Sequence, residues 1–160
     1  MNQELRDIMA YDEAHYFGVE EDIVLGGVIT EMSENANPIE KEKQYIHEKS
    51  KRETVTGFKN EFPITMDMVK GDRVYDDFYG LWYRRETGNA LLRDHYIVNL
   101  WEPIEGAEDT FKCRKINQTV KITEATNVAG EQKTMSGSLT GGDFVYGSFN
   151  VKTKTFTENV

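Results

Sequence analysis

The spacing of apolar and polar side chains predicts mostly β-strands, because apolar residues recur at every second position in several stretches. The clearest example is residues 54–69, which we predict to form one long strand. Its larger apolar side chains all fall on even positions: Phe58, Phe62, Ile64, Met66 and Met68. Since alternate residues of a strand share one face, we expect that face to be buried.

Further strands are predicted where β-branched and aromatic residues cluster between turn signals. These stretches are residues 23–32, 40–47, 93–101, 110–124, 133–139 and 144–157. Gly26-Gly27 indicates a bulge or bend within the first of them. The second is unusually polar and follows the turn-forming residues 34–38.

One amphipathic helix is predicted over about residues 72–85. Asp72 is a suitable N-cap, because its short side chain can accept a hydrogen bond from a free N–H group of the first turn. Apolar residues then recur at the spacing of one helical face: Val74, Phe78, Leu81 and Trp82. We expect these four side chains to pack the helix against the sheet, and Gly88-Asn89 to end it.

These elements indicate a mainly β fold: a β-sandwich or open barrel of about six or seven antiparallel strands with one flanking α-helix. A chain of 160 residues is long enough for one domain with a sizeable core. We assign residues 23–160 to that domain. Residues 1–22 hold seven acidic residues against Arg6 alone and show no clear period, so we predict an acidic N-terminal arm.

Residues 35–57 are predicted to form a polar arm. Residues 40–52 alternate charges and contain only Tyr45 and Ile46 as sizeable apolar side chains, so packing on their own subunit is weakly favoured. The arm is either an exposed hairpin or a segment that becomes ordered against a neighbouring subunit, where alternating Lys and Glu supply complementary pairs. The candidate contact residues are Glu40, Lys41, Glu42, Lys43, Tyr45, His47, Lys49, Lys51 and Arg52.

The overall charge argues against tight nucleic-acid binding. The chain has 28 acidic and 19 basic residues, a net charge of −9, whereas such binding depends on Lys and Arg neutralising phosphates. Cys113 is the only cysteine, which excludes an intramolecular disulfide. No signal peptide and no run of about 18 apolar residues is visible, so we expect folding in a reducing cytoplasm without membrane insertion.

No residue pattern predicts a catalytic, metal or cofactor site, and we expect no enzyme activity. His15, His47 and His95 lie in separate elements, without the spacing that places two metal ligands on one face. Asp94 is adjacent to His95 on a strand, so their side chains point to opposite faces. Residues 137–142 have the glycine spacing of a phosphate loop, but Asp143 stands where a lysine is needed, so we interpret them as a turn.

The order of these elements resembles that of the tail tube protein, or major tail protein, of long-tailed bacteriophages and related phage-derived particles. The resemblance covers about residues 24–156. It rests on VITEMSENANP, the charged stretch 40–53, TVTGFKNEFPITMDM, GDRVYDDFYGLWYRRETG and SGSLTGGDFVYGSFNVKTKTF. The acidic residues 1–22 match no feature of that family.

The resemblance implies a subunit of the virion tail that assembles into hexameric rings, which stack into a hollow conduit for DNA delivery. The implied partners are further copies of the chain, a tape-measure protein in the lumen, and tail-end or baseplate proteins. DNA would pass transiently without specific binding. Assembly would occur in the host cytoplasm, with the polar arm contacting neighbouring copies and the helix bracing the wall from outside.

Two other classes of protein stay open at this point. A monomeric small-ligand-binding β-barrel would line a cavity with Trp82, Trp101 and the phenylalanines, and its ligand would stabilise it. An enzyme on a β-sandwich scaffold would need a convergent set of titratable residues, which the sequence does not show.

Overall fold

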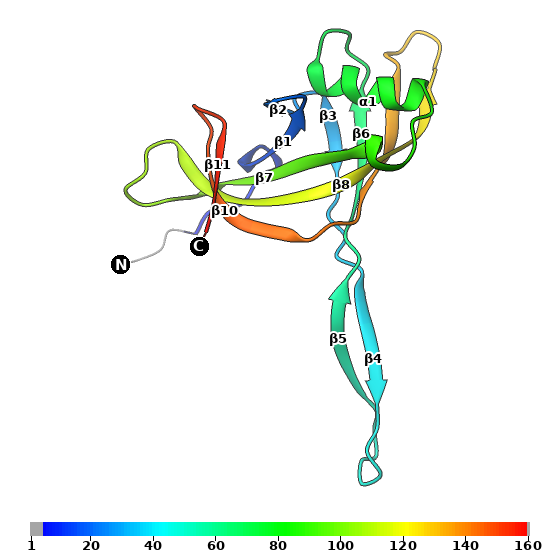
Figure 1. The fold of residues 1–160 in the computed structure, drawn as a ribbon, viewed down its shortest axis with the longest axis vertical. Coiled ribbons are helices and arrows are strands. Elements are labelled where there is room, and N and C mark those ends of the chain that lie inside the picture. Colours follow the sequence, from blue (N-terminus) through cyan, green and yellow to red (C-terminus); the bar gives the residue numbers. More distant parts are fainter. Residues whose placement is uncertain (1–4, 160) are drawn as a thin grey trace.

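The chain folds into a curved antiparallel sheet that carries one helix, and a long hairpin projects from it (Figure 1). The computed structural model describes residues 5–159. Its elements are η1 (Ala10–Asp12), β1 (Glu13–Val19), β2 (Asp22–Leu25), β3 (Ile29–Met32), β4 (Pro38–Lys43), β5 (Arg52–Phe58), β6 (Glu61–Asp67), α1 (Arg73–Tyr83), η2 (Gly88–Leu91), β7 (Leu92–Pro103), β8 (Thr110–Thr126), β9 (Thr134–Thr140), β10 (Phe144–Asn150) and β11 (Thr155–Glu158). The predicted mainly β fold with one flanking helix is confirmed, with eleven strands in the described part of the chain where the sequence predicts six or seven.

Nine of these strands form one sheet. Its main path is β2-β1-β7-β8-β9-β6-β3, and β10 pairs with both β8 and β11. Within residues 5–159 the end strands β2 and β3 are not paired with each other, so the sheet is curved without closing into a barrel. The remaining strands, β4 and β5, form a separate two-stranded sheet.

The 17-residue strand β8 links two parts of the sheet. Its residues 110–116 pair with β10 and its residues 119–126 with β9, both on the edge opposite β7. The chain passes from β9 to β10 through a bend at Gly141-Gly142. Gly142 has a φ of +83°, and a Cβ atom there would lie 2.1 Å from the carbonyl oxygen of Asn117. Only glycine therefore fits this bend without a backbone shift.

The central strands are buried on both faces. On one face, Phe17 of β1 and Ile97 of β7 enter the main core together with Phe62 of β6 and the buried side of α1. On the other face, Tyr16 enters a second cluster with Phe149 of β10. Because adjacent strand residues point to opposite faces, β1 and β7 separate two packed layers, which is the arrangement of a sandwich.

The helix α1 contacts β8, β1 and β2. The carboxylate of Asp72 accepts a hydrogen bond from the backbone N–H of Tyr75 at 3.0 Å, as expected for the N-cap. Trp82 is half-buried, and the guanidinium of Arg85 lies 4.6 Å from its ring centre. The other three predicted packing residues are buried in the main core: Val74, Phe78 and Leu81.

The predicted N-terminal arm is wrong for residues 13–22, which belong to the sheet. β1 pairs with β7 in a register that places Phe17 opposite His95, and β2 folds back on β1. Tyr16 and Phe17 are both buried, on opposite faces of β1. This two-sided burial removes the two-residue period by which a strand is recognised. Residues 1–4 of the predicted arm lie outside the described residues.

Three stretches predicted as single strands are each divided in two. Residues 144–157 turn at 151–154, so that β10 and β11 pair with each other. Residues 23–32 turn near Gly26-Gly27, so that β2 pairs with β1 and β3 with β6. Residues 54–69 break between Phe58 and Glu61, where the chain passes from the projecting β5 to β6 of the main sheet. Phe58 is consequently 61% exposed, whereas Phe62 is fully buried. The even-position pattern continues through the break and therefore does not reveal it.

The helix α1 has eleven residues. Within residues 5–159, no helix has both the length and the apolar character needed to cross a lipid bilayer.

Candidate functional site

The hairpin β4–β5 is exposed along nearly its whole length. Its strands pair only with each other, from Pro38 opposite Phe58 to Lys43 opposite Arg52, and it projects well away from the body (Figure 1). The structure places all nine sequence-predicted contact residues on this hairpin, each of them exposed: Glu40, Lys41, Glu42, Lys43, Tyr45, His47, Lys49, Lys51 and Arg52. Whether they contact another subunit stays a prediction.

The hairpin tip, residues 44–51, is organised around Tyr45. The ammonium of Lys43 lies 4.8 Å and the guanidinium of Arg52 5.8 Å from the centre of the Tyr45 ring, within the range of a cation–π contact. Arg52 also forms an ion pair of 2.8 Å with Glu48. The amide of Gln44 donates to the carbonyl oxygen of Glu48 at 3.0 Å. These local contacts define the shape of the loop at the far end of the hairpin.

Hydrogen bonds fix the root of the hairpin to the body. The side chain of Asn37 donates to the carbonyl oxygen of Lys59 at 3.1 Å, and the N–H of Lys59 donates to the carbonyl oxygen of Ala36 at 3.0 Å. Asn35 and Glu61 form a β-bridge at the start of the main sheet. The hairpin therefore leaves the body in a defined direction.

An open groove of about 440 Å³ lies between this root and strands β8 and β10. Arg114 forms two hydrogen bonds with the carboxylate of Glu34, at 2.7 and 2.8 Å, and its guanidinium lies 4.7 Å from the ring centre of Phe144. The hydrogen bond to Glu34 raises the pKa of Arg114. Phe58 and Tyr146 also line the groove, and their side chains are 61% and 59% exposed. A charged pair and two exposed aromatic rings thus adjoin the hairpin.

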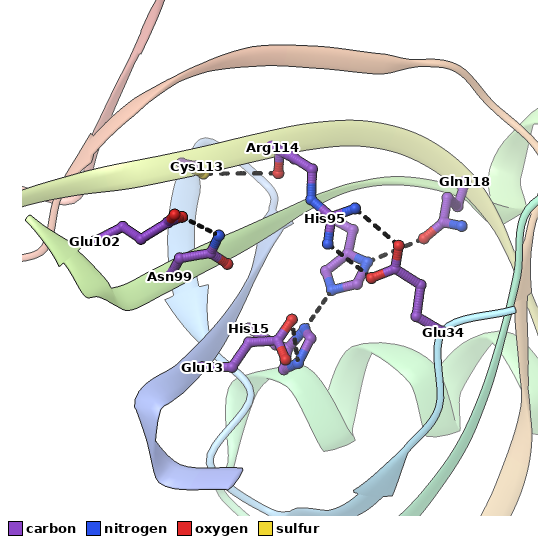
Figure 2. A network of polar contacts seen from close by, with 9 residues as sticks. All are labelled: Glu13, His15, Glu34, His95, Asn99, Glu102, Cys113, Arg114 and Gln118. Carbon is purple, nitrogen blue, oxygen red and sulfur yellow. Dashed lines mark hydrogen bonds and ion pairs between the residues drawn. The ribbon is translucent and has the colours of Figure 1, made fainter. Parts of the chain in front are cut away.

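A histidine pair from β1 and β7 lies on the main-core face of the sheet, where His95 is buried and the His15 side chain is 19% exposed (Figure 2). His15 Nδ1 is 2.9 Å from His95 Nε2, and His95 Nδ1 is 3.0 Å from Gln118 Oε1. The Gln118 amide nitrogen donates to the carbonyl oxygen of Leu139 at 3.5 Å, which orients its oxygen toward His95. His95 must then donate through Nδ1 and accept through Nε2, so His15 donates through Nδ1. The unprotonated His15 Nε2 faces Glu13 at 3.9 Å.

Burial keeps both rings neutral. It lowers the pKa of His15 to about 4 and that of His95 to about 3, where the neighbouring His15 lowers it further. Burial, followed by the nearby Glu34, also raises the pKa of Glu13. His95 stacks on Phe17 at a ring distance of 4.7 Å. The arrangement is that of a hydrogen-bonded core pair, and among residues 5–159 no group of three or more His, Cys, Asp or Glu side chains is placed to hold a metal ion.

Sequence reasoning misses this pair because it assigns residues 13–22 to an arm. His15 and His95 are 80 positions apart in the chain, and only the pairing of β1 with β7 brings them together. The separate expectation for Asp94 is correct, since its carboxylate accepts a hydrogen bond from Asn117 on the face opposite His95. No spacing in the sequence signals the histidine contact.

A ligand-binding barrel, the alternative that the sequence leaves open, would bring Trp82, Trp101 and the phenylalanines together around one cavity. Trp82 lies on α1 above a small hollow of about 140 Å³, which Trp101 does not line. The phenylalanines expected around such a cavity instead fill the cores, and four of them are fully buried: Phe17, Phe62, Phe78 and Phe149. This packing and the open sheet differ from the closed, cavity-forming barrel that the ligand-binding alternative expects.

The comparisons with known proteins identify a similar fold. No family model and no curated protein matches the chain. Among solved structures, the chain is similar to one in the cryo-electron microscopy structure of the anti-feeding prophage baseplate, which was symmetrised six-fold. The two share 8% sequence identity with a TM-score of 0.52, over 93% of this chain and 99% of the other. At this identity the likeness establishes a shared fold.

Proposed function

We propose that this chain is the structural subunit of a phage tail tube or of a related tail-like particle. Copies assemble into hexameric rings, and the rings stack into a hollow conduit through which DNA is delivered. The observation that carries the proposal is the hairpin β4–β5, whose two strands are exposed and pair with no other strand among residues 5–159. A two-stranded hairpin of this kind is marginally stable alone, so it is best explained as a contact element for another chain.

The fold likeness supports the same proposal. The similar solved chain belongs to a baseplate with six-fold symmetry, and nearly its whole length is matched. A protein that repeats the same fold around such an axis forms head-to-tail contacts that close into a ring. We propose that this chain also belongs to a tail-like particle. More specifically, we propose that it forms the hexameric rings of the tube.

Unpaired strand edges supply a second kind of contact. Within the described residues, β2 and β3 end the main path of the sheet, and β11 pairs only with β10. Exposed edges carry free N–H and C=O groups that invite pairing with a neighbouring chain. In a ring each copy can pair with its neighbour, so that no edge stays free.

The distribution of charge suits a conduit for DNA. The hairpin residues 38–58, including the loop, hold five basic and four acidic residues, and the chain as a whole is acidic at −9. An acidic wall repels phosphates and favours passage over binding. The proposed partners are other copies of this chain, a tape-measure protein before ejection, and tail-end or baseplate proteins.

Truncating the hairpin tests the proposal. We expect a variant in which residues 41–54 are replaced by Asn-Gly to keep the folded body, because the turn then joins the paired residues Glu40 and Val55 and because β4 and β5 share no sheet with the body. The purified wild type should form particles much larger than a monomer as its concentration rises, and the variant should stay monomeric. Light scattering measures the size, and circular dichroism checks the fold of both. Equal assembly of the two proteins would contradict the proposed role of the hairpin.

A further inference from the structure

The register of the hairpin sorts its charges by sign. Residues directly opposite each other in an antiparallel pair share a face, and successive pairs alternate between faces. Glu40 lies opposite Val55, and Glu42 opposite Glu53. These two pairs therefore form one face, which we call the acidic face.

The intervening pairs form the other face, which we call the basic face. Lys41 lies opposite Thr54, and Lys43 lies opposite Arg52. Each face thus presents three charges of one sign from its strands. All six charged side chains are exposed.

Oppositely charged side chains of the loop neutralise only part of the charge of each face. Lys51 lies 3.5 Å from Glu42 on the acidic face, and Glu48 lies 2.8 Å from Arg52 on the basic face. One opposite charge against three leaves each face with a net charge of two, negative on one side and positive on the other.

This sorting is unfavourable within a single chain. Glu42 opposite Glu53 and Lys43 opposite Arg52 are like-charged cross-strand pairs, and such pairs destabilise a sheet. Exchanging the residues at positions 42 and 43 would give two attractive pairs with the same composition. The ion pair of Glu42 with Lys51 and the contact of Lys43 with the Tyr45 ring offset only part of this cost within the hairpin.

We propose that the hairpin is a charge-sorted connector between copies of this chain: its acidic face and its basic face contact two different neighbouring copies, each through a surface of opposite charge. The occupant is a second copy because the chain itself offers both complements. The strongly acidic remainder suits the basic face, and the basic residues of β8 or of another hairpin suit the acidic face. This inference rests on the proposed assembly function.

The E42K/K43E exchange tests this inference most directly. It preserves composition and net charge. Within the hairpin it relieves both like-charged cross-strand pairs, which offsets the loss of the exposed Glu42–Lys51 ion pair and of the Lys43–Tyr45 contact. Each face, however, then carries mixed signs. We expect the concentration at which assembly begins to rise about tenfold or more, because the complementary fields at the contacts are lost. Sedimentation velocity over a concentration series measures it.

A second exchange, E40K/K41E, separates face sorting from local pairing. Val55 and Thr54 oppose these positions, so this exchange leaves the like-charged pairs in place while it mixes the faces in the same way. It should weaken assembly as E42K/K43E does. The matched control E42D/K43R keeps the sign on each face and should assemble like the wild type.

The outcomes separate this inference from the proposed function. If the wild type assembles and both exchange variants assemble at the same concentration, face sorting is overturned while the assembly function stands. If the wild type stays monomeric over the whole concentration range, both fall. The inference is supported if both exchange variants assemble only at higher concentration and the control assembles like the wild type. Circular dichroism must show that all these proteins are folded.

Discussion

His95 lies where the main core meets the pairing of β1 with β7, and its surroundings fix its protonation. It stacks on Phe17, donates to Gln118 and accepts from His15. Each polar atom of the ring is thereby satisfied, which a buried imidazole requires. A second proton on His95 would remove the hydrogen bond from His15 and leave a charge in an apolar layer.

The histidine pair predicts a stability that falls in acid. The folded-state pKa values of about 4 for His15 and about 3 for His95 lie below the unfolded value of about 6.5. Between these values the unfolded chain binds protons that the folded chain does not, so the free energy of unfolding is highest above about pH 6.5 and declines toward about pH 4. At pH 5 each histidine should account for a loss of up to about 2 kcal/mol relative to pH 7.

Urea denaturation at pH 5 and pH 7 measures this loss. We expect the H95Q variant to be less stable than the wild type at both pH values, because the hydrogen bonds of His15 and Gln118 are disturbed, but to show a smaller difference between them. H47Q, which removes an exposed histidine at the hairpin tip, is the matched control and should keep the wild-type difference. The same pH difference in H95Q as in the wild type would rule out the pair as its source.

At the scale of elements, the sequence predicts those helices and strands whose apolar residues follow one regular spacing. The helix is predicted within two residues, because Asp72 caps it and one apolar face is buried. The stretches after it are also predicted as strands, but residues 144–157 form two strands, β10 and β11, because the chain turns at residues 151–154. β1 is missed because it is buried on both faces, and the division between β5 and β6 is missed because the apolar parity runs on through Phe58. The histidine pair depends on a long-range strand pairing that no local pattern encodes.

The bend between β9 and β10 gives a prediction at the same scale. The G142A substitution should destabilise the fold by about 2 kcal/mol or more, because its methyl group would lie 2.1 Å from the Asn117 carbonyl oxygen in a backbone with φ of +83°. Gly141 has nearly the same φ, +84°, but a methyl group there would meet no atom of the described chain within 4 Å beyond its immediate neighbours. G141A is therefore the matched control, and should cost only about 1 kcal/mol. Thermal unfolding of both variants compares them, and equal losses would show that the close approach does not matter.

At the scale of the whole molecule, the structure is a packed body with an appendage that projects away from it. The two cores, the capped helix and the neutral histidine pair all lie in the body. The hairpin carries exposed charges sorted by face, and the described sheet retains free edges. Both features would gain stability from contact with further copies. Ordered self-assembly is therefore the central claim of the proposed function.

Negative-stain electron microscopy of the concentrated and aged wild-type protein tests this central claim most directly. The account predicts hollow tubes of uniform width, or rings with six-fold symmetry when viewed end on. Seeding with sonicated assemblies should lengthen tubes without a lag, because stacking adds copies to an existing ring. A protein that stays monomeric when concentrated, aged and mixed with particles of its own tail would contradict the account.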